Sequence, residues 1–378
     1  MSLTDLDITG YRSIRSIRFP LKRLTVLVGG NGVGKTNLYR GLELVHAAAT
    51  GDLVRNLARE GGLASAMWAG PRRVSDKPRL IFEVGLDTIL PGDDEAAFVP
   101  RYSVEVGFGN SRYEAVFEQE PQIKAENLVL PGRRSVTLLE RKGPAAWYRD
   151  EDGRIRQLDH PLLASETALS ALRGTLPELD TVRYMLAEWR FYHGFRTDSD
   201  SPLRRPSLAV TSPTLDADGR NLGAVLATLK HIRGDTVDLD AAIEQAFPGA
   251  RLEIPPPERD ASFSMIFPEM PHRSFAPAEL SDGTLQFLAL LGALLAYRLP
   301  PFIALNEPET SLHPDLLPAL ARAIARAAER TQVWVVTHSV PLAEAIAEET
   351  GIVPRTVIRR DGGTWLEGLS DIGIFPED

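Results

Sequence analysis

One segment constrains the fold of this chain more than any other: a glycine-rich loop between a short apolar run and a longer helical pattern. Residues 24–28 read LTVLV, a β-branched run typical of a buried strand. Residues 29–36 read GGNGVGKT and satisfy the pattern G-x-x-x-x-G-K-[ST], and residues 37–49 predict a helix. Strand, loop and helix in this order predict a phosphate-binding loop in an α/β fold.

The residue types of the loop indicate what it can bind. Glycines let the backbone N–H groups wrap phosphate oxygens, and the amino end of the following helix adds the positive end of its dipole. We expect Lys35 to reach the β- and γ-phosphates of a nucleotide and the Thr36 hydroxyl to bind Mg²⁺. The predicted nucleotide-binding residues here are Gly29, Gly30, Asn31, Gly32, Val33, Gly34, Lys35, Thr36 and Asn37.

Two further apolar runs predict buried strands that end in polar residues. Residues 301–305 are followed by Asn306 and Glu307, and the strand at residues 332–336 leads to His338. A carboxylate at the end of a strand beside a phosphate loop can orient or deprotonate the water that attacks the γ-phosphate, so Glu307 is the candidate catalytic base. The imidazole of His338 can contact the γ-phosphate or that water, and a structural histidine is the alternative.

A second anion site is predicted near the C-terminal part of the chain. Residues 279–285 read ELSDGTL, and an apolar helix is expected over residues 286–297. Ser281 can cap that helix and Gly283 lets a ligand approach its first N–H groups, so phosphate binding is predicted for Ser281, Asp282 and Gly283. A capping turn without a ligand is the alternative.

The middle of the chain carries two other patterns. Period-2 alternation broken by Pro-Gly pairs predicts an antiparallel meander at residues 79–86, 101–108, 112–118, 123–130 and 136–140. Residues 165–247 carry a helical pattern that residues 201–219 interrupt, and residues 51–76 predict loops with a short helix. We therefore expect an antiparallel β subdomain and a mainly helical lobe within residues 51–250; the resemblance described below implies that residues 1–50 and 251–378 form one head into which this region is inserted.

The composition and the apolar runs of the sequence limit the kinds of site and the cellular location that we expect. The chain has no cysteine, which excludes disulfides, thiolate zinc sites and iron–sulfur clusters. Its longest apolar run is about half of the roughly 20 residues that span a bilayer, and no signal-peptide pattern begins the sequence. We expect a cytoplasmic protein without a membrane segment, and the net charge of −9 weighs against a general DNA-coating surface.

Local basic clusters leave DNA contact open. Basic residues gather beside Trp147 and Tyr148, a combination suited to phosphate contact and base stacking, yet acidic residues lie among them, as on solvated faces. The two clusters consist of Arg133, Arg134, Arg141, Lys142, Arg149, Arg154 and Arg156, and of Arg190, Arg196, Arg204 and Arg205.

The motifs in this order resemble the ABC-type ATPase heads of the SMC/RecF/OLD superfamily. Residues 8–14, ITGYRSI, look like the N-terminal strand signature of that family, and GGNGVGKTN looks like its Walker A loop. LSDGT resembles a variant of its signature motif, FIALNEPETSLHP its Walker B strand with the D-loop, and VVTHS its switch histidine loop. The likeness covers residues 1–50 and 275–345 and hardly extends to the middle of the chain.

The resemblance implies a P-loop ATPase with a mixed sheet flanked by helices, two copies of which enclose two ATP molecules. Ser281 and Gly283 of one copy would then act on the nucleotide bound by Lys35 and Thr36 of the other. The chain has no sustained heptad repeat, and about forty residues follow His338. Long coiled-coil arms and a fused nuclease domain are therefore not expected, and the outline is RecF-like.

One position departs from the family pattern. Asn306 stands where an acid usually holds Mg²⁺ directly or through water, and an amide oxygen brings no charge to the cation. We expect Thr36 and Asn306 to be the Mg²⁺-binding residues and ATP turnover to be slow. The glutamine loop of the family stays unassigned, with Gln119 and Gln122 the nearest residues in the sequence.

Two functions follow from the resemblance. The first is an ATP-dependent homodimeric ATPase that acts on DNA in repair or anti-phage defence, which the complete motif set and the basic clusters favour. The second is a regulatory ATP-binding module that times assembly with a protein effector and does not contact DNA. Asn306 and the acidic net charge favour this second function.

Overall fold

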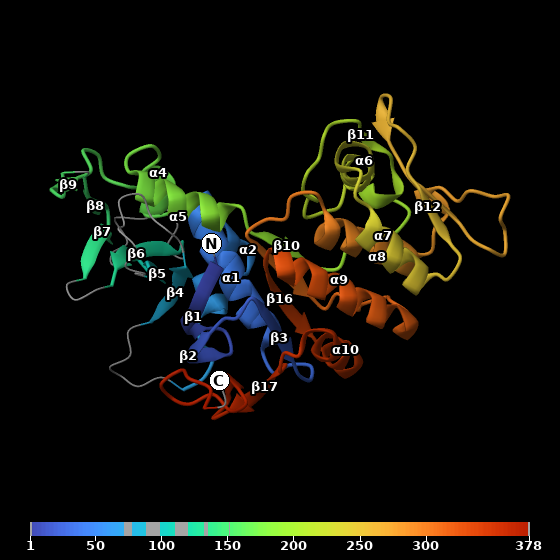
Figure 1. Ribbon diagram of the computed structural model, residues 1–378. Coiled ribbons are helices and arrows are strands. Elements are labelled where there is room, and N and C mark those ends of the chain that lie inside the picture. Colours follow the sequence, from blue (N-terminus) through green and yellow to red (C-terminus); the bar gives the residue numbers. More distant parts are fainter. Residues whose placement is uncertain are drawn as a thin grey trace. The chain divides into compact units, whose positions relative to one another are not determined.

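Two sheets of different kinds organise the chain, one in each of two compact units (Figure 1). The computed structural model describes residues 2–71, 78–87, 99–109, 120–131, 135–150 and 152–376. Unit 1 comprises Met1–Lys22, Gly30–Trp189 and Thr356–Asp378, and unit 2 comprises Arg23–Gly29 and Arg190–Arg355. This α/β architecture confirms the predicted fold class, whereas the expected head and inserted region stay a prediction.

Unit 1 is built on an antiparallel sheet whose described strands have the order β2-β1-β4-β5-β6-β7-β8-β9. Alternate residues of β4, among them Leu80, Phe82 and Val84, are buried, as expected of a strand with one face on a core. The strands are β1 (Ser2–Tyr11), β2 (Ile14–Pro20), β4 (Arg79–Asp87), β5 (Arg101–Gly107), β6 (Gln122–Leu130), β7 (Val136–Lys142), β8 (Ala145–Arg149) and β9 (Ile155–Gln157).

The predicted meander is confirmed where the structure describes it, at β4, β5, β6 and β7. The stretch predicted at residues 112–118 lies outside the described residues. Four strands extend the sheet beyond the prediction: β1 and β2 join it through the β1–β4 pairing, and β8 and β9 follow β7. β9 has only three residues, too few for an alternating pattern to be recognised.

Helices and a hairpin complete unit 1. α1 (Lys35–Thr50) packs against β1 and β4, and Gly41 permits this close approach because a Cβ atom there would collide with Ile8. Two short helices, not one, follow α1. The remaining elements are α2 (Leu53–Arg59), α3 (Gly62–Ala66), α4 (Ala168–Ala171), α5 (Pro177–Ala187), and a C-terminal hairpin of β17 (Arg355–Arg360) and β18 (Gly363–Leu366).

Unit 2 contains four parallel strands in the order β10-β15-β16-β3. They are β10 (Arg190–Tyr192), β15 (Phe302–Asn306), β16 (Gln332–Thr337) and β3 (Leu24–Val28). All residues of β16 are buried, and those of β15 and β3 are buried apart from the last residue of each. Such runs are typical of parallel strands covered on both faces, and parallel strands end at one edge of the sheet.

The elements predicted for unit 2 are confirmed to within a few residues, apart from β10. This short strand lies in a region predicted to be helical, and three residues carry too little periodicity to identify a strand. The helices are α6 (Leu222–Ala227), which continues as a π-helical turn (Thr228–Arg233), α7 (Val237–Ala246), α8 (Asp282–Leu295), α9 (Leu317–Arg330) and α10 (Val340–Thr350). Short elements are β11 (Ser207–Leu208), β12 (Arg251–Glu253), β13 (Asp260–Ala261), β14 (Ser264–Ile266) and 3₁₀ turns at Pro202–Arg204, Pro277–Glu279 and Pro314–Leu316.

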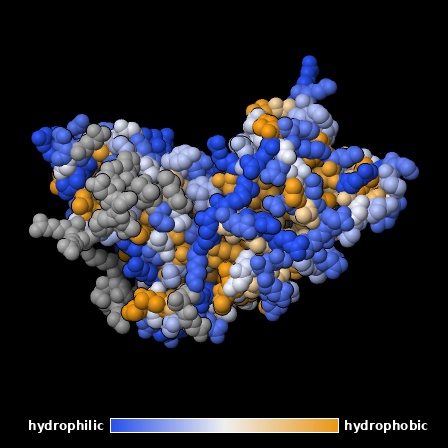
Figure 2. Space-filling view, in the orientation of Figure 1, coloured by the Kyte–Doolittle hydropathy of each residue, from blue (hydrophilic) through white to orange (hydrophobic). Residues whose placement is uncertain are grey.

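α8 lies in the core of unit 2 and is apolar around its circumference. It packs against α6, α7 and α9, and Leu285, Phe287 and Leu288 have no exposed surface. Of the helices in the described ranges, none has the length and apolar character needed to cross a bilayer. The face of the molecule in Figure 2 is mostly hydrophilic, with apolar side chains in scattered groups, which is ordinary for a protein surface.

Candidate functional site

The phosphate loop leaves the carboxyl end of β3 and leads into α1. Gly32 and Gly34 have φ angles of +78° and +103°, a conformation that glycine adopts without the clash of a Cβ atom. Lys35, the first residue of α1, is buried, and its Nζ donates a hydrogen bond of 2.8 Å to the carbonyl oxygen of Gly30. The ammonium group therefore turns back over the loop, and its contact with nucleotide phosphates stays a prediction.

The first turn of α1 carries the other polar residues of the motif. Thr36 is half-buried and follows Lys35 directly. Asn37 donates a hydrogen bond of 2.6 Å from Nδ2 to Oγ of Ser13, in the turn between β1 and β2. The structure therefore gives Asn37, a predicted nucleotide-binding residue, a contact that fixes the start of the helix within the protein.

In unit 2, three neighbouring strands bring predicted residues to one edge. β15 ends at Asn306 and β16 ends at Thr337, so Glu307 and His338 leave adjacent parallel strands at the same side of the sheet. Gly29, the first residue of the phosphate loop, leaves the next strand, β3, at that edge. The carboxyl edge of a parallel sheet is the usual location of ligand sites in α/β folds.

Glu307 has an unusual backbone. Its φ angle is +50°, in the left-handed region that residues with a Cβ atom seldom adopt, and its N–H group donates a hydrogen bond of 2.7 Å to the carbonyl oxygen of Val336 on β16. The side chain is 33% exposed and so remains available to a ligand. Backbone strain of this kind is concentrated at functional sites, which supports the choice of Glu307 from the sequence.

A buried carboxylate that the sequence reasoning missed, that of Glu309, organises this edge. Its Oε1 accepts hydrogen bonds of 3.1 Å from the backbone N–H groups of His338 and Ser339, and a further one from the Thr337 hydroxyl. Nδ1 of His338 lies 3.2 Å from the same oxygen and 3.7 Å from Oε1 of Glu307. A neutral imidazole that donates from Nδ1 to Glu309 has Nε2 as its acceptor.

The sequence signal for Glu309 was available but weak. It is the second acid of the segment NEPET, two residues after Glu307, and its side chain is only 6% exposed. Its partners are about thirty residues further along the chain, after β16, and only the pairing of β15 with β16 makes them neighbours. No local pattern reports that pairing.

Two buried oxygen atoms at this edge lack a hydrogen-bond partner within the described ranges: Oδ1 of Asn306 and Oε2 of Glu309. A buried acceptor without a donor is costly and often marks a place where a ligand or water binds. The amide oxygen of Asn306 and the hydroxyl of Thr36 are hard oxygen ligands. Oxygens of this type can bind Mg²⁺ directly or accept hydrogen bonds from its bound waters. The donor chemistry of both predicted residues therefore fits Mg²⁺.

The signature segment, residues 280–284, forms the capped N-terminus of α8 and is bound to a neighbouring loop. Oγ of Ser281 accepts a hydrogen bond of 3.2 Å from the N–H group of Thr284, which confirms Ser281 as the cap of α8. Asp282 forms an ion pair of 2.6 Å with Arg204, whose guanidinium also donates to the carbonyl oxygens of Pro277, Ala278 and Leu280. Arg204 therefore fixes the backbone that precedes the cap.

Gly283 is required by packing within unit 2. A Cβ atom at this position would lie 2.9 Å from the carbonyl oxygen of Ser311, in the segment after β15. A cavity of about 660 Å³ opens here, lined by Ser281, Gly283 and residues 311–316 among others. The structure thus joins the signature segment to the segment that follows Glu309, whereas the binding of a ligand by Ser281, Asp282 and Gly283 stays a prediction.

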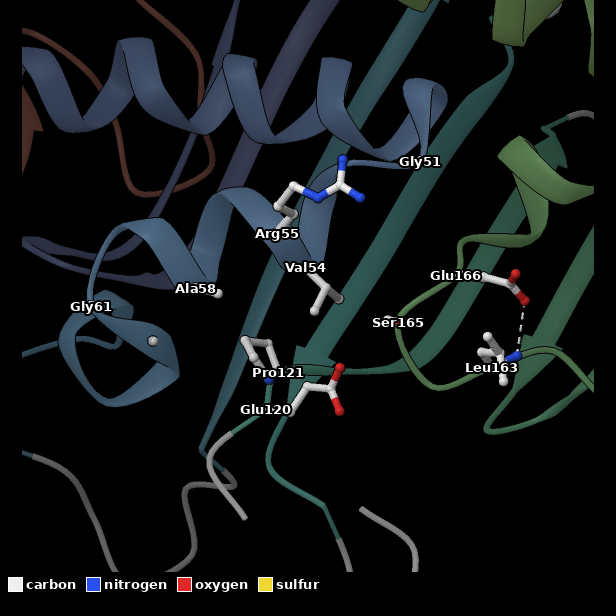
Figure 3. Close-up of a pocket in the computed structure, with 11 residues that line it drawn as sticks. Gly51, Val54, Arg55, Ala58, Gly61, Glu120, Pro121, Leu163, Ser165 and Glu166 are labelled. Atoms are coloured by element: carbon white, nitrogen blue, oxygen red, sulfur yellow. Dashed lines mark hydrogen bonds between the residues drawn. The ribbon is translucent and has the colours of Figure 1, made fainter. Parts of the chain in front are cut away.

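A second cavity, of about 730 Å³, lies in unit 1 between α2 and the loop at residues 163–166 (Figure 3). Two of its charged groups are already engaged: Glu166 accepts a hydrogen bond of 3.0 Å from the N–H group of Leu163, and Arg55 pairs with Asp52 at 2.6 Å. None of the predicted site residues lines this cavity. We therefore assign the candidate chemistry to the loop and the strand edge.

The basic clusters have fewer available side chains than the sequence indicated. Arg141 is fully buried and donates to the carbonyl oxygens of Gly143, Leu163 and Glu166, and Arg204 is only 13% exposed. Both arginines hold loops together within the protein, so neither is available for the DNA contact that the sequence left open. Arg156 and Arg154 pair with acidic neighbours, whereas Arg133 and Arg134 lie outside the described residues.

Comparison with known proteins supports one fold family. Residues 24–343 match the family model described as "AAA domain, putative AbiEii toxin, Type IV TA system". No curated protein matches the sequence.

The fold is similar to several solved SMC head domains. An SMC head bound to the C-winged helix domain of ScpA is 14% identical, with a TM-score of 0.50 over 98% of this chain and 99% of that chain. An SMC head with an extended coiled coil, bound to the C-terminal domain of ScpA derived from Pyrococcus furiosus, is 13% identical, with a TM-score of 0.50 over 98% and 96%. The head domain from Thermotoga maritima is 16% identical, with a TM-score of 0.43 over 97% and 98%. At these identities the first two similarities show the fold alone, that of an SMC head domain.

Proposed function

This chain belongs to the AAA-domain family whose model matches residues 24–343, and from that membership and its ABC-type ATPase head fold we propose that it binds and hydrolyses ATP. One observation carries the proposal, the strand order of unit 2. β3, which leads into the phosphate loop, is followed by β16 and β15, which lead to His338 and Glu307. The loop begins at Gly29, at the edge where β16 and β15 also end, and these strand ends supply a base and an imidazole for attack on a γ-phosphate.

Each residue has a distinct role in this proposal. The backbone N–H groups of residues 29–34 bind the α- and β-phosphates, and Lys35 binds the β- and γ-phosphates. Glu307 orients the attacking water and accepts its proton. His338 presents Nε2 to the γ-phosphate or that water, and Glu309 holds the loop that carries His338.

Mg²⁺, when bound, neutralises charge on the phosphate oxygens and stabilises the leaving group. The Thr36 hydroxyl and the buried amide oxygen of Asn306 would hold it, the latter through a bound water. Neither group carries a charge, so this chain should bind Mg²⁺ less tightly than a head with an acid at residue 306. Slow turnover is the expected consequence.

We further propose that two copies assemble around ATP. Ser281 caps α8, and Gly283 in the first turn of that helix has no side chain, so that N–H groups of this turn can bind the γ-phosphate held by the partner copy. ATP would then stabilise the closed dimer, and hydrolysis would release it. Nucleotide-dependent dimerisation is therefore part of the proposed function.

Two roles compete for the partner on which this ATPase acts. Action on DNA, in repair or defence, rests on the family motifs and on exposed basic residues such as Arg154. Control of a protein effector in the cytoplasm is favoured by the engagement of Arg141 and Arg204 within the protein and by the net charge of −9. Two of the similar solved structures are SMC heads bound to ScpA domains, which supports a protein partner for this chain.

The first experiment measures phosphate release from ATP by the full chain, with and without Mg²⁺, for the natural protein and Glu307→Gln. We expect turnover to fall at least about 100-fold in the variant, because the general base is lost, while binding of a fluorescent ATP analogue is retained. Glu344→Gln, an exposed position on α10, is the control and should behave like the natural protein. Absence of nucleotide binding by the natural protein would refute the proposed function.

The same assay separates the two roles when duplex, gapped and single-stranded DNA are added at fixed salt. Stimulation by one form of DNA would support the DNA role and identify its substrate. Turnover that is indifferent to every form would support the effector role, since the salt-dependent phosphate contacts of a DNA-binding head would then be missing.

A further inference from the structure

The C-terminal hairpin of unit 1 has a geometry that fixes the direction of two side chains. β17 and β18 are joined by the two-residue turn Asp361-Gly362, with φ angles of +51° and +78°, the signs required by a type I′ turn. The register pairs Arg359 with Thr364. Directly paired residues of antiparallel strands point to the same face, so these two side chains project together.

Both side chains end on the phosphate loop. Oγ1 of Thr364 donates a hydrogen bond of 2.9 Å to the carbonyl oxygen of Val33. Arg359 donates from Nε and Nη2 to the carbonyl oxygen of Gly32, at 3.2 and 3.1 Å. The hairpin thus binds two consecutive carbonyl groups of the loop, although its sequence belongs to no phosphate-binding motif.

The contact of Thr364 is the last link of a hydrogen-bonded chain. Asn37 donates from Nδ2 to Oγ of Ser13, Ser13 lies 2.6 Å from Oγ1 of Thr364, and Thr364 donates to Val33. Since the Thr364 hydroxyl donates to Val33, it accepts from Ser13. Every link therefore points the same way, from the first turn of α1 to the loop, and such chains strengthen each of their bonds.

Packing leaves no room for a side chain at Gly34, which lies at the centre of this contact. A Cβ atom added to Gly34 would collide with Oγ1 of Thr364 and with Oγ of Ser13. The glycine is therefore required both by its φ angle of +103° and by the position of the hairpin hydroxyl.

Peptide geometry converts these carbonyl contacts into an effect on phosphate binding. Each peptide unit is planar and trans, so its N–H group points away from its C=O group. Holding the carbonyls of Gly32 and Val33 therefore fixes the directions of the N–H groups of Val33 and Gly34, on the opposite side from the hairpin. In the described part of the chain, neither N–H group donates to a protein acceptor. Hydrogen bonding to a carbonyl also polarises the peptide unit and makes its N–H a stronger donor.

We propose that Thr364 and Arg359 are positioning residues of the nucleotide site, which hold the N–H groups of Val33 and Gly34 in the direction of the α- and β-phosphates. The inference rests on the proposed ATP binding and makes the C-terminal hairpin part of that site. The β-phosphate is common to ADP and ATP, so both nucleotides gain equally from these contacts. Thr364 is the more important of the two, because its hydroxyl is buried whereas Arg359 is exposed to competing water.

The test compares dissociation constants of fluorescent ADP and ATP analogues without Mg²⁺. We expect Thr364→Val to weaken both nucleotides about tenfold, Arg359→Ala about threefold, and Thr364→Ser, which keeps the hydroxyl, less than twofold. Arg360→Ala is the matched control. Arg360 follows Arg359 in the same strand, but pairs with Asp371 at 2.9 Å and lies over Trp365, so its loss should leave nucleotide affinity unchanged.

Hydrogen–deuterium exchange of residues 30–36 without nucleotide supplies a second, independent measurement. Exchange should be faster in Thr364→Val than in the natural protein or Arg360→Ala, because the loop loses its anchor. The inference is overturned if exchange and both affinities are unchanged in Thr364→Val, if Arg360→Ala reproduces the loss, or if only ATP binding weakens. A natural protein that binds no nucleotide at all would instead refute the proposed function.

Discussion

The two sheets of this protein distribute their polar side chains in opposite ways. In unit 2 the parallel strands β15 and β16 are buried almost along their whole length, and the residues with ligand chemistry, Asn306, Glu307 and His338, lie where these strands end. The antiparallel sheet of unit 1 carries charged side chains along its strands. Arg101 of β5, for example, pairs with Asp5 of β1 at 2.8 Å and with Glu83 of β4 at 2.5 Å.

This difference separates side chains that hold the fold from those that are available for chemistry. The charges on the antiparallel face neutralise each other across neighbouring strands, so little of their hydrogen-bonding capacity remains for a ligand. At the parallel edge, by contrast, Oδ1 of Asn306 and Oε2 of Glu309 are buried acceptors without a donor within the described ranges. Unsatisfied groups of this kind are expected where a substrate, metal or water completes the site.

The largest effect that follows from this comparison concerns Glu309. Glu309→Ala removes the acceptor that holds the N–H groups of His338 and Ser339, and at metal sites the loss of a partner that orients a histidine typically costs about 10–100-fold in affinity or activity. We expect ATP turnover to fall by this amount while nucleotide affinity changes less than about threefold. Phosphate release and equilibrium binding measure the two quantities.

Two controls distinguish positioning from general destabilisation. Glu309→Gln keeps an oxygen acceptor at the same place and should retain more activity than the alanine variant, whereas Glu344→Ala on the exposed face of α10 should have no effect. Equal turnover by Glu309→Ala and the natural protein would show that activity at the carboxyl edge of the parallel sheet does not depend on this carboxylate.

The parts of the site that the sequence predicts are those set by local geometry. The phosphate loop is recognisable because the glycines, Lys35 and Thr36 act within eight consecutive residues between a strand and a helix. Ser281 is recognisable for the same reason, as a cap next to its own helix. Glu309 and Thr364 are different, because their partners are far along the chain, at residues 337–339 and at residue 33.

The fold follows the same division. Strands with clear alternation or a long apolar run are predicted, and so are the helices α1 and α8. The sequence does not predict that β1 and β2 join the antiparallel sheet, or that β10 joins the parallel one, because strand partners are chosen by tertiary packing. The engagement of Arg141 and Arg204 within the protein is unpredicted for a related reason: the sequence does not show which carbonyl groups they bind.

Asn306→Asp, at the carboxyl edge of the parallel sheet, is expected to have a smaller effect on ATP turnover. The carboxylate adds a charge where the amide oxygen is buried and without a partner, so the Mg²⁺ concentration for half-maximal turnover should fall severalfold and kcat should rise. Without Mg²⁺ the same charge repels phosphate, and ATP binding should not strengthen. A magnesium titration of turnover, with binding measured in EDTA, tests both statements, and unchanged Mg²⁺ dependence together with unchanged kcat would contradict them.

The smallest effect on ATP turnover is expected from substitution of Asp5, a charged residue of the antiparallel sheet of unit 1. Burial opposes the ionisation of Asp5, but the hydrogen bonds and charge of Arg101, with help from Thr4 and Arg18, outweigh it and lower the pKa of Asp5 below its ordinary value. A lowered pKa means that the ionised group stabilises the fold above the unfolded-state pKa, and that this contribution is lost as the pH falls through the folded-state pKa. Asp5→Asn should therefore cost about 1–2 kcal/mol at pH 7 and progressively less below about pH 4, with ATP turnover within about twofold of the natural protein.

Asp7, two residues along the same strand, supplies a control of opposite sign. Burial and the charge of Glu83 raise its pKa, so its ionised form is disfavoured in the folded state, and Asp7→Asn should leave stability at pH 7 unchanged or increase it. Urea unfolding of both variants at pH 7, 5 and 3 makes the measurement. If Asp5→Asn instead lowered turnover as far as Glu309→Ala does, the antiparallel face would belong to the working site and the contrast between the two sheets would fail. If Asp5→Asn changes only the free energy of unfolding, and only above the pKa of Asp5, then the charge of Asp5 stabilises the fold and has no role in turnover.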